Sequence, residues 1–88
     1  MTKQELIEKL DTLGVKPTWY SLDDRIIEGT NMERNFNYYG DNKKYEEWRV
    51  FEQERGNRWN EDIFYNEDEA YENIYQRFKI SLKHNNKA

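Results

Sequence analysis

The sequence predicts an α+β fold, in which a three- to four-stranded antiparallel sheet carries an N-terminal and a C-terminal helix on one face. Apolar residues recur at helical spacing near both ends of the chain. In the middle they alternate with polar residues, and clusters of turn residues separate the alternating segments. A chain of 88 residues suffices for one core, so we expect a single domain over residues 1–88.

The N-terminal helix is predicted over residues 3–13. Thr2 and Glu5 form a capping box, in which each side chain accepts a hydrogen bond from the backbone N–H of the other residue. Leucines then recur at helical spacing. Gly14 permits the left-handed conformation that ends a helix, and Pro17 prevents the helix from resuming.

Strands are predicted in the middle of the chain, over residues 34–39, 45–53 and 58–64. Trp48 and Val50 alternate with Arg49 and Phe51, so the first two should face the core and the other two the opposite side. The third strand is expected to point Trp59, Glu61 and Ile63 to one face and Asn60, Asp62 and Phe64 to the other. Residues 19–22 are predicted to be extended, and residues 29–31 to form a loop.

The C-terminal helix is predicted over residues 67–83. Asn66 and Glu69 form a second capping box, and acidic residues fill the first turn, where the helix dipole favours negative charge. Tyr71 and Phe78 follow the helical spacing and are expected in the core.

The charge distribution favours a basic partner. The net charge is −4 and the pI is near 5.0, which argues against binding to nucleic acid or to an anionic membrane. Residues 41–69 hold five basic and ten acidic residues, whereas residues 70–88 have a net charge of +3. An acidic patch of this kind steers a basic protein toward the surface that carries it.

Few residues offer catalytic chemistry. The chain has no Cys, which excludes disulfides and Cys-ligated zinc. The single histidine, His84, lies near the polar tail, where a general base would not be held in place. The four glycines are isolated and make no phosphate-binding loop. We therefore predict a protein that is not an enzyme and that uses no cofactor or metal.

Carboxylates leave one enzymatic alternative open. Adjacent strand residues point to opposite faces, so Glu46 and Glu47 should diverge, whereas Glu52 and Glu54 could share a face. A pair that converged in a cleft would suit the acid–base chemistry of a hydrolase. The other interpretation of these residues is a solvated acidic rim.

The sequence also bears on the cellular compartment of the protein and on which aromatic side chains are exposed. The first residues are polar and no apolar run approaches the ~20 residues that span a membrane, so a cytoplasmic protein is expected. Tyr39 and Phe51 fall on the sheet face that the helices do not cover, where exposed aromatic residues would anchor a protein partner. Alternatively, the first helix or an oligomeric partner covers that face.

Several short segments together resemble a known class of proteins. They are Gly14-Val15-Lys16-Pro17, Trp19-Tyr20-Ser21-Leu22-Asp23, Trp48-Arg49-Val50-Phe51, Glu54-Arg55-Gly56, Phe64 and Asn66-Glu67-Asp68-Glu69-Ala70. This pattern, from about Leu6 to Leu82, is similar to small bacterial immunity proteins of polymorphic toxin and contact-dependent growth-inhibition systems.

The resemblance implies a protein that binds its cognate toxin domain inside the producing cell and neutralises it stoichiometrically. The toxin would often be a nuclease with a basic cleft, and the free immunity protein a monomer or weak dimer. On this hypothesis the expected partner-binding residues are Asp23, Asp24, Tyr39, Glu47, Arg49, Phe51, Glu52 and Glu54. The alternative is a small regulatory or oligomerising interaction module without a toxin partner.

Overall fold

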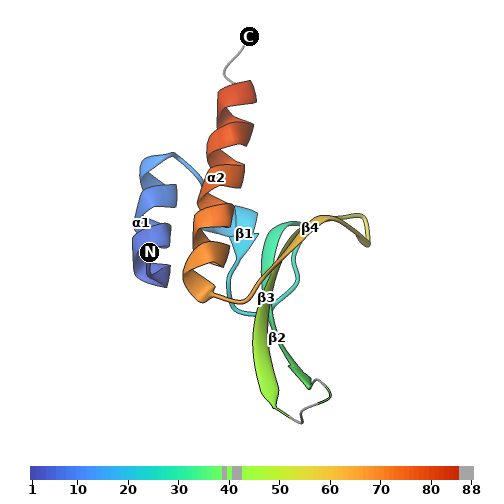
Figure 1. Ribbon diagram of the computed structural model, residues 1–88. Coiled ribbons are helices and arrows are strands. Elements are labelled where there is room, and N and C mark those ends of the chain that lie inside the picture. Colours follow the sequence, from blue (N-terminus) through green and yellow to red (C-terminus); the bar gives the residue numbers. More distant parts are fainter. Residues whose placement is uncertain (39, 41–42, 86–88) are drawn as a thin grey trace.

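The computed structural model describes residues 1–38, 40 and 43–85, and it confirms the α+β fold with a helix at each end of the chain. The elements are α1 (Lys3–Thr12), the 3-10 turn η1 (Pro17–Trp19), β1 (Tyr20–Ser21), β2 (Gly29–Tyr38), β3 (Lys44–Glu54), β4 (Asn57–Phe64) and α2 (Glu67–Asn85), as Figure 1 shows. The strands form one sheet in the order β1-β2-β3-β4.

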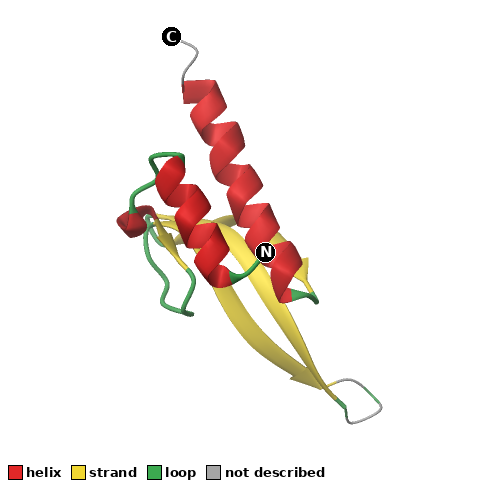
Figure 2. Ribbon diagram, turned by 90° about the vertical axis from the view of Figure 1, so that its left-hand side faces the viewer, coloured by secondary structure: helices red, strands yellow, loops and turns green. Residues whose placement is uncertain are grey.

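Both helices lie on the same side of the sheet. α2 packs on β3 and β4, and α1 packs against α2 (Figures 1 and 2). The core therefore lies between the helices and one sheet face. Its buried side chains come from α1 (Leu6, Leu10), the segment after α1 (Val15), the sheet (Met32, Trp48, Val50) and α2 (Ala70, Tyr71, Ile74).

The signals at the ends of α1 act as predicted. Thr2 Oγ1 accepts from the backbone N of Glu5 at 3.1 Å, and Glu5 Oε1 accepts from the backbone N of Thr2 at 3.3 Å. Gly14 has a φ of 87°, and the next residue, Val15, donates its backbone N–H to Leu10 O at 2.9 Å. This 6→1 bond is the Schellman arrangement, and it brings the buried Val15 back onto the helix.

α2 begins at a cap formed by Asn66. The side-chain oxygen of Asn66 accepts from the backbone N of Asp68 at 2.8 Å, one residue earlier than the Glu69 of the predicted capping box. Tyr71 is buried and Phe78 is partly buried against the core, which confirms the predicted stripe.

The start of β2 differs from the prediction, because residues 29–31 are strand and not loop. Asn31 is fully buried, and its side chain accepts from Ile27 N and donates to Ile27 O, each at 2.8 Å. These bonds satisfy the backbone of the preceding loop, so a polar turn-forming residue is stable inside a strand. β1 pairs with this part of β2 in parallel, which makes the mostly antiparallel sheet a mixed one.

A bulge in β4 changes which side chains share a face. The register of β3 and β4 shifts between Val50 and Glu52, and Asn60 has a φ of 54°. Trp59 pairs with Glu52 and therefore lies on the helix side of the sheet. The prediction that Trp59 shares a face with Glu61 and Ile63 is wrong, since the extra residue reverses the alternation.

The far end of the β2–β3 hairpin extends beyond the helices. β4 pairs with β3 only from Trp48 to Glu54, whereas residues 44–47 pair with residues 35–38 alone among the described strands. We call these two segments the arm; Figure 1 shows it pointing away from both helices. It contributes to an elongated molecule, with extents of 52 × 29 × 20 Å.

Candidate partner-binding surface

Three of the predicted partner-binding residues lie together on the sheet face opposite the helices. Glu47, Arg49 and Phe51 alternate along β3 with the core residues Trp48 and Val50, as predicted. We call this side of the sheet the uncovered face, because neither helix packs on it (Figure 2).

Phe51 is not exposed on the uncovered face. Its ring is fully buried, and the guanidinium carbon of Arg58 lies 3.7 Å from the ring centroid. The buried Asn31 is its cross-strand neighbour. The prediction of an exposed Phe51 anchor is therefore wrong, because an arginine of β4 covers the ring by a cation–π contact.

The charged residues of the uncovered face form one ionic network. Arg58 pairs with Glu33 at 3.1 Å and Glu61 at 3.0 Å, and Arg49 pairs with Glu61 at 3.3 Å and Glu47 at 3.0 Å. Glu47 is 4% exposed, and its hydrogen bond raises the pKa of the Arg49 guanidinium. Three carboxylates around two guanidinium groups leave a net charge of −1, so this network is acidic.

The other predicted residues are dispersed. Glu52 and Glu54 lie on the helix side of β3, and Tyr39 lies outside the described residues. Asp23 is exposed in the loop after β1, where the hydrogen bond from Ser21 Oγ, at 2.8 Å, lowers the pKa of its carboxyl. Asp24 is exposed beside it and accepts from the backbone N of Arg34 at 2.6 Å, so it secures the loop to the edge of β2.

Glu52 belongs to a site that sequence reasoning missed, because its partner is Arg77 of α2. Arg77 Nη1 donates to Glu52 Oε2 at 2.9 Å, and its Nη2 lies 2.9 Å from Asp62 Oδ2. Nη2 also donates to Asn60 O at 2.7 Å. The bulge turns this carbonyl toward α2, so one arginine joins the helix to both strands.

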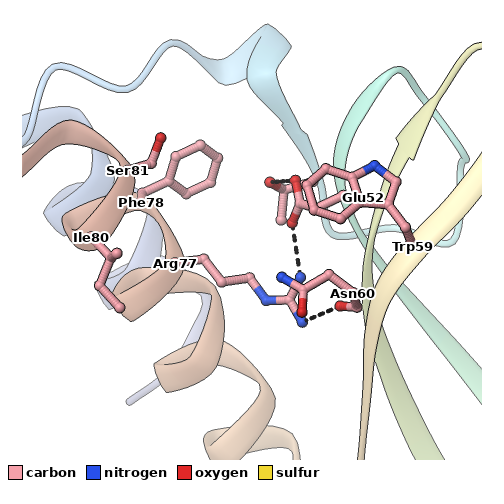
Figure 3. A pocket seen from close by; sticks show the side chains of 8 residues that line it. Glu52, Trp59, Asn60, Arg77, Phe78, Ile80 and Ser81 are labelled. Atoms are coloured by element: carbon pink, nitrogen blue, oxygen red, sulfur yellow. Dashed lines mark hydrogen bonds and ion pairs between the residues drawn. The ribbon is translucent and has the colours of Figure 1, made fainter. Parts of the chain in front are cut away.

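A hollow of about 320 Å³ opens beside Arg77, between the C-terminal half of α2 and the sheet (Figure 3). Its sheet side is formed by Thr30, Glu52, Trp59 and Asn60, and its helix side by Arg77, Phe78, Ile80 and Ser81. We call it the α2–β4 hollow. The register explains its floor, since Thr30, Glu52 and Trp59 are paired neighbours across β2, β3 and β4.

Two further hollows lack this combination of rings and paired charges. The wider one, of about 530 Å³, lies between α1 and residues 17–27. The other, of about 330 Å³, lies between α1 and Tyr75.

Among the described residues no group of three or more His, Cys, Asp or Glu side chains is placed to hold a metal ion. The described helices include none long and apolar enough to cross a membrane.

Comparison with protein-family models, with curated proteins and with solved structures finds no match to this chain.

Proposed function

We propose that this protein is an immunity protein that binds a basic toxin domain in a one-to-one complex and thereby neutralises it. The observation that carries the proposal is the combination of exposed apolar residues and carboxylates along the edge strand β4 and the turn into α2. We call residues 58–69 the β4 segment.

The β4 segment has the composition of a protein-binding surface for a cationic partner. Its five carboxylates and one guanidinium give a net charge of −4, equal to that of the whole chain. Trp59, Ile63 and Tyr65 are 54%, 42% and 66% exposed. Trp59 lies on the helix side and Ile63 on the uncovered face, so the two flank the free edge of β4, where both are accessible to a partner. Aromatic residues are the commonest anchors of protein interfaces, and surrounding charges set the choice of partner.

The geometry supports a wider acidic surface around this segment. Glu61 is bonded to Arg49 and Arg58, so the segment is continuous with the ionic network of the uncovered face. Two of the eight predicted partner-binding residues, Glu47 and Arg49, belong to that network. A nuclease toxin holds phosphates in a basic cleft, and an acidic protein that occupies the cleft would exclude the nucleic acid.

A pull-down from lysate of the native organism, at low and at moderate salt, tests the proposal. The expected result is capture of one basic toxin domain at a one-to-one ratio, with loss of that toxin's activity on binding. Capture should weaken at the higher salt, because screening reduces the attraction between the two surfaces.

Two variants sharpen this experiment. Tyr65→Ala removes an exposed aromatic residue of the β4 segment and should weaken capture, whereas Phe36→Ala removes one from the arm and should not. Recovery of the chain alone, as a defined oligomer, would contradict neutralisation of a toxin and favour the oligomerising module instead.

A further inference from the structure

We infer that the α2–β4 hollow receives an arginine or lysine side chain of the protein partner. The inference rests on the proposed function and specifies how the partner is held at the start of the β4 segment.

The walls fit the aliphatic stem of a long basic side chain. Trp59 and Ile80, on opposite sides of the hollow, are 54% and 56% exposed. Phe78 is held in place by Tyr20, with the ring centroids 6.1 Å apart in an edge-on arrangement. Figure 3 shows the sheet and helix side chains on either side of an open space. The α2–β4 hollow can therefore bury the methylene groups of a lysine or arginine side chain, and the Trp59 ring offers a face to its cationic end.

The charge of the hollow favours a cation. Glu52 and Arg77 are the charged residues that line the hollow, and Asp62, outside the lining, pairs with Nη2 of the same guanidinium. The positive charge of Arg77 is thus shared between two carboxylates, and the three groups together have a net charge of −1. Glu52 Oε1 accepts from Thr30 Oγ1 at 2.7 Å and Oε2 accepts from Arg77 at 2.9 Å. A carboxylate oxygen can accept two hydrogen bonds, so Glu52 has capacity for a donor from the partner.

An anion would be disfavoured at the same place. Arg77 Nε donates to Asn73 Oδ1 at 2.7 Å, and Nη2 is shared among Asn60 O, Val50 O and Asp62. The guanidinium is thus committed to groups of the protein itself. A phosphate or carboxylate entering the hollow would meet the carboxylate of Glu52 and a largely occupied arginine, whereas a cation would balance the negative charge that Glu52 and Asp62 leave around Arg77.

The β4 bulge is the local feature that builds the hollow. The left-handed conformation of Asn60 shifts the register by one residue and places Trp59 opposite Glu52, on the helix side. Without the extra residue the indole would lie on the uncovered face. Bulges commonly redirect a side chain next to a binding site, and here the bulge brings a ring beside a carboxylate.

Titration of the isolated protein with a short peptide, acetyl-Gly-Arg-Gly-amide, tests the inference without the toxin. The analogue with citrulline, which has the shape of arginine without the charge, serves as the matched probe. The readout is the NMR signal of the indole N–H of Trp59, with those of Trp19 and Trp48 as internal references. We expect the arginine peptide to cause a saturable shift of the Trp59 signal with a dissociation constant of roughly 1 mM. The citrulline peptide should bind at least about fivefold more weakly, because it lacks the charge.

Variants distinguish the hollow from general attraction to an acidic protein. Ile80→Ala should weaken binding of the arginine peptide, whereas Ile26→Ala, a change of the same type in the loop between β1 and β2, should leave it unchanged. Equal shifts with both peptides, no saturable shift, or equal effects of the two variants would overturn the inference. Such a result would leave the pull-down unaffected, whereas failure to capture a toxin would contradict the proposed function even if the peptide bound.

Discussion

Among the charged side chains that the structure describes, Arg77 is the one whose replacement should lower the stability of the fold most. Its side chain is 12% exposed and its ion-pair partner Glu52 is 20% exposed. Arg77→Met would keep much of the packing but leave a partly buried carboxylate and two strand carbonyls without their donor. We expect the free energy of unfolding to fall by about 2 to 3 kcal/mol, measured by urea denaturation.

Arg34→Met is the matched control for Arg77→Met. Arg34 pairs with Glu46 at 2.8 Å, but the two side chains are 47% and 43% exposed. Solvent screens such a pair, so the loss should be about 1 kcal/mol or less. Equal destabilisation by both variants would show that Arg77 does not join α2 to the sheet as the geometry indicates.

Tyr71 should make stability depend on alkaline pH. Burial, and then its hydrogen bond to Glu67, raises the pKa of the Tyr71 phenol above the ordinary value of 10.0. The unfolded chain therefore releases this proton at a lower pH than the folded chain does. The stabilisation is complete below about pH 10 and is lost as the pH rises from there toward the folded pKa.

Tyr71→Phe tests this dependence by urea denaturation across a series of pH values. At neutral pH the variant should be less stable by about 1 kcal/mol, because the hydrogen bond to Glu67 is absent. Above about pH 10 the difference should shrink, since only the wild-type chain loses the contribution of this proton. A constant difference at all pH values would contradict the assignment.

The environment of a residue could be predicted from the sequence where its neighbours lie in the same strand or helix, and not where they come from another element. The burial of Trp48 and Val50 follows from alternation within one strand. Arg77 could not be recognised, because Asp62 and Glu52 lie 15 and 25 residues away from it. The exposure of Phe51 was predicted wrongly for the same reason, since the residue that covers its ring comes from the next strand.

At the scale of elements, glycines at the ends of helices and strands should differ in their tolerance of substitution. Gly14 ends α1 with a φ of 87° and has open space around it, so Gly14→Ala should cost about 1 kcal/mol from backbone strain alone. Gly29 has a φ of 136°, and an added Cβ would lie 2.6 Å from Trp19 O. Gly29→Ala should therefore cost more than about 2 kcal/mol, because the contact between the η1–β1 segment and β2 must open.

Gly40→Ala provides the comparison for these two variants in thermal or urea unfolding. Gly40 has no left-handed φ, and among the described residues none lies within 4 Å of an added Cβ. Its replacement should leave stability unchanged or raise it by up to about 1 kcal/mol, through the unfolded chain. The loss of stability should be largest for Gly29→Ala, smaller for Gly14→Ala and absent for Gly40→Ala, and a different order would contradict the roles given to these glycines.

Elements with a local signal were predictable, and elements defined by distant contacts were not. The helices are marked by caps and apolar stripes, so their limits agree with the prediction within two residues. The first part of β2 carries Gly, Thr and Asn, which favour a loop when read alone. It is a strand because β1, β3 and the bonds of Asn31 hold it there. Likewise, the α2–β4 hollow depends on a bulge that alternation does not predict.

At the scale of the whole molecule, protection against unfolding should be uneven along β3. Residues 48–52 have β2 on one side, β4 on the other and core side chains under the helices. Residues 44–46, in the arm, pair with β2 alone among the described strands and are exposed, whereas Glu47, where the arm meets the rest of the sheet, is buried. A two-stranded ribbon without a packed face is marginally stable in water.

Native-state hydrogen exchange measures this difference within one strand. Hydrogen-bonded amides of the arm should open locally, with a free energy of about 1 to 2 kcal/mol, whereas those around Val50 should exchange only with global unfolding. Val50 is fully buried, and Tyr45 is 38% exposed, so the gradient should follow burial. The measurement is repeated at two protein concentrations. Protection of the arm that rises with concentration would show that a second copy covers it, and would then favour the oligomerising module over a free immunity protein.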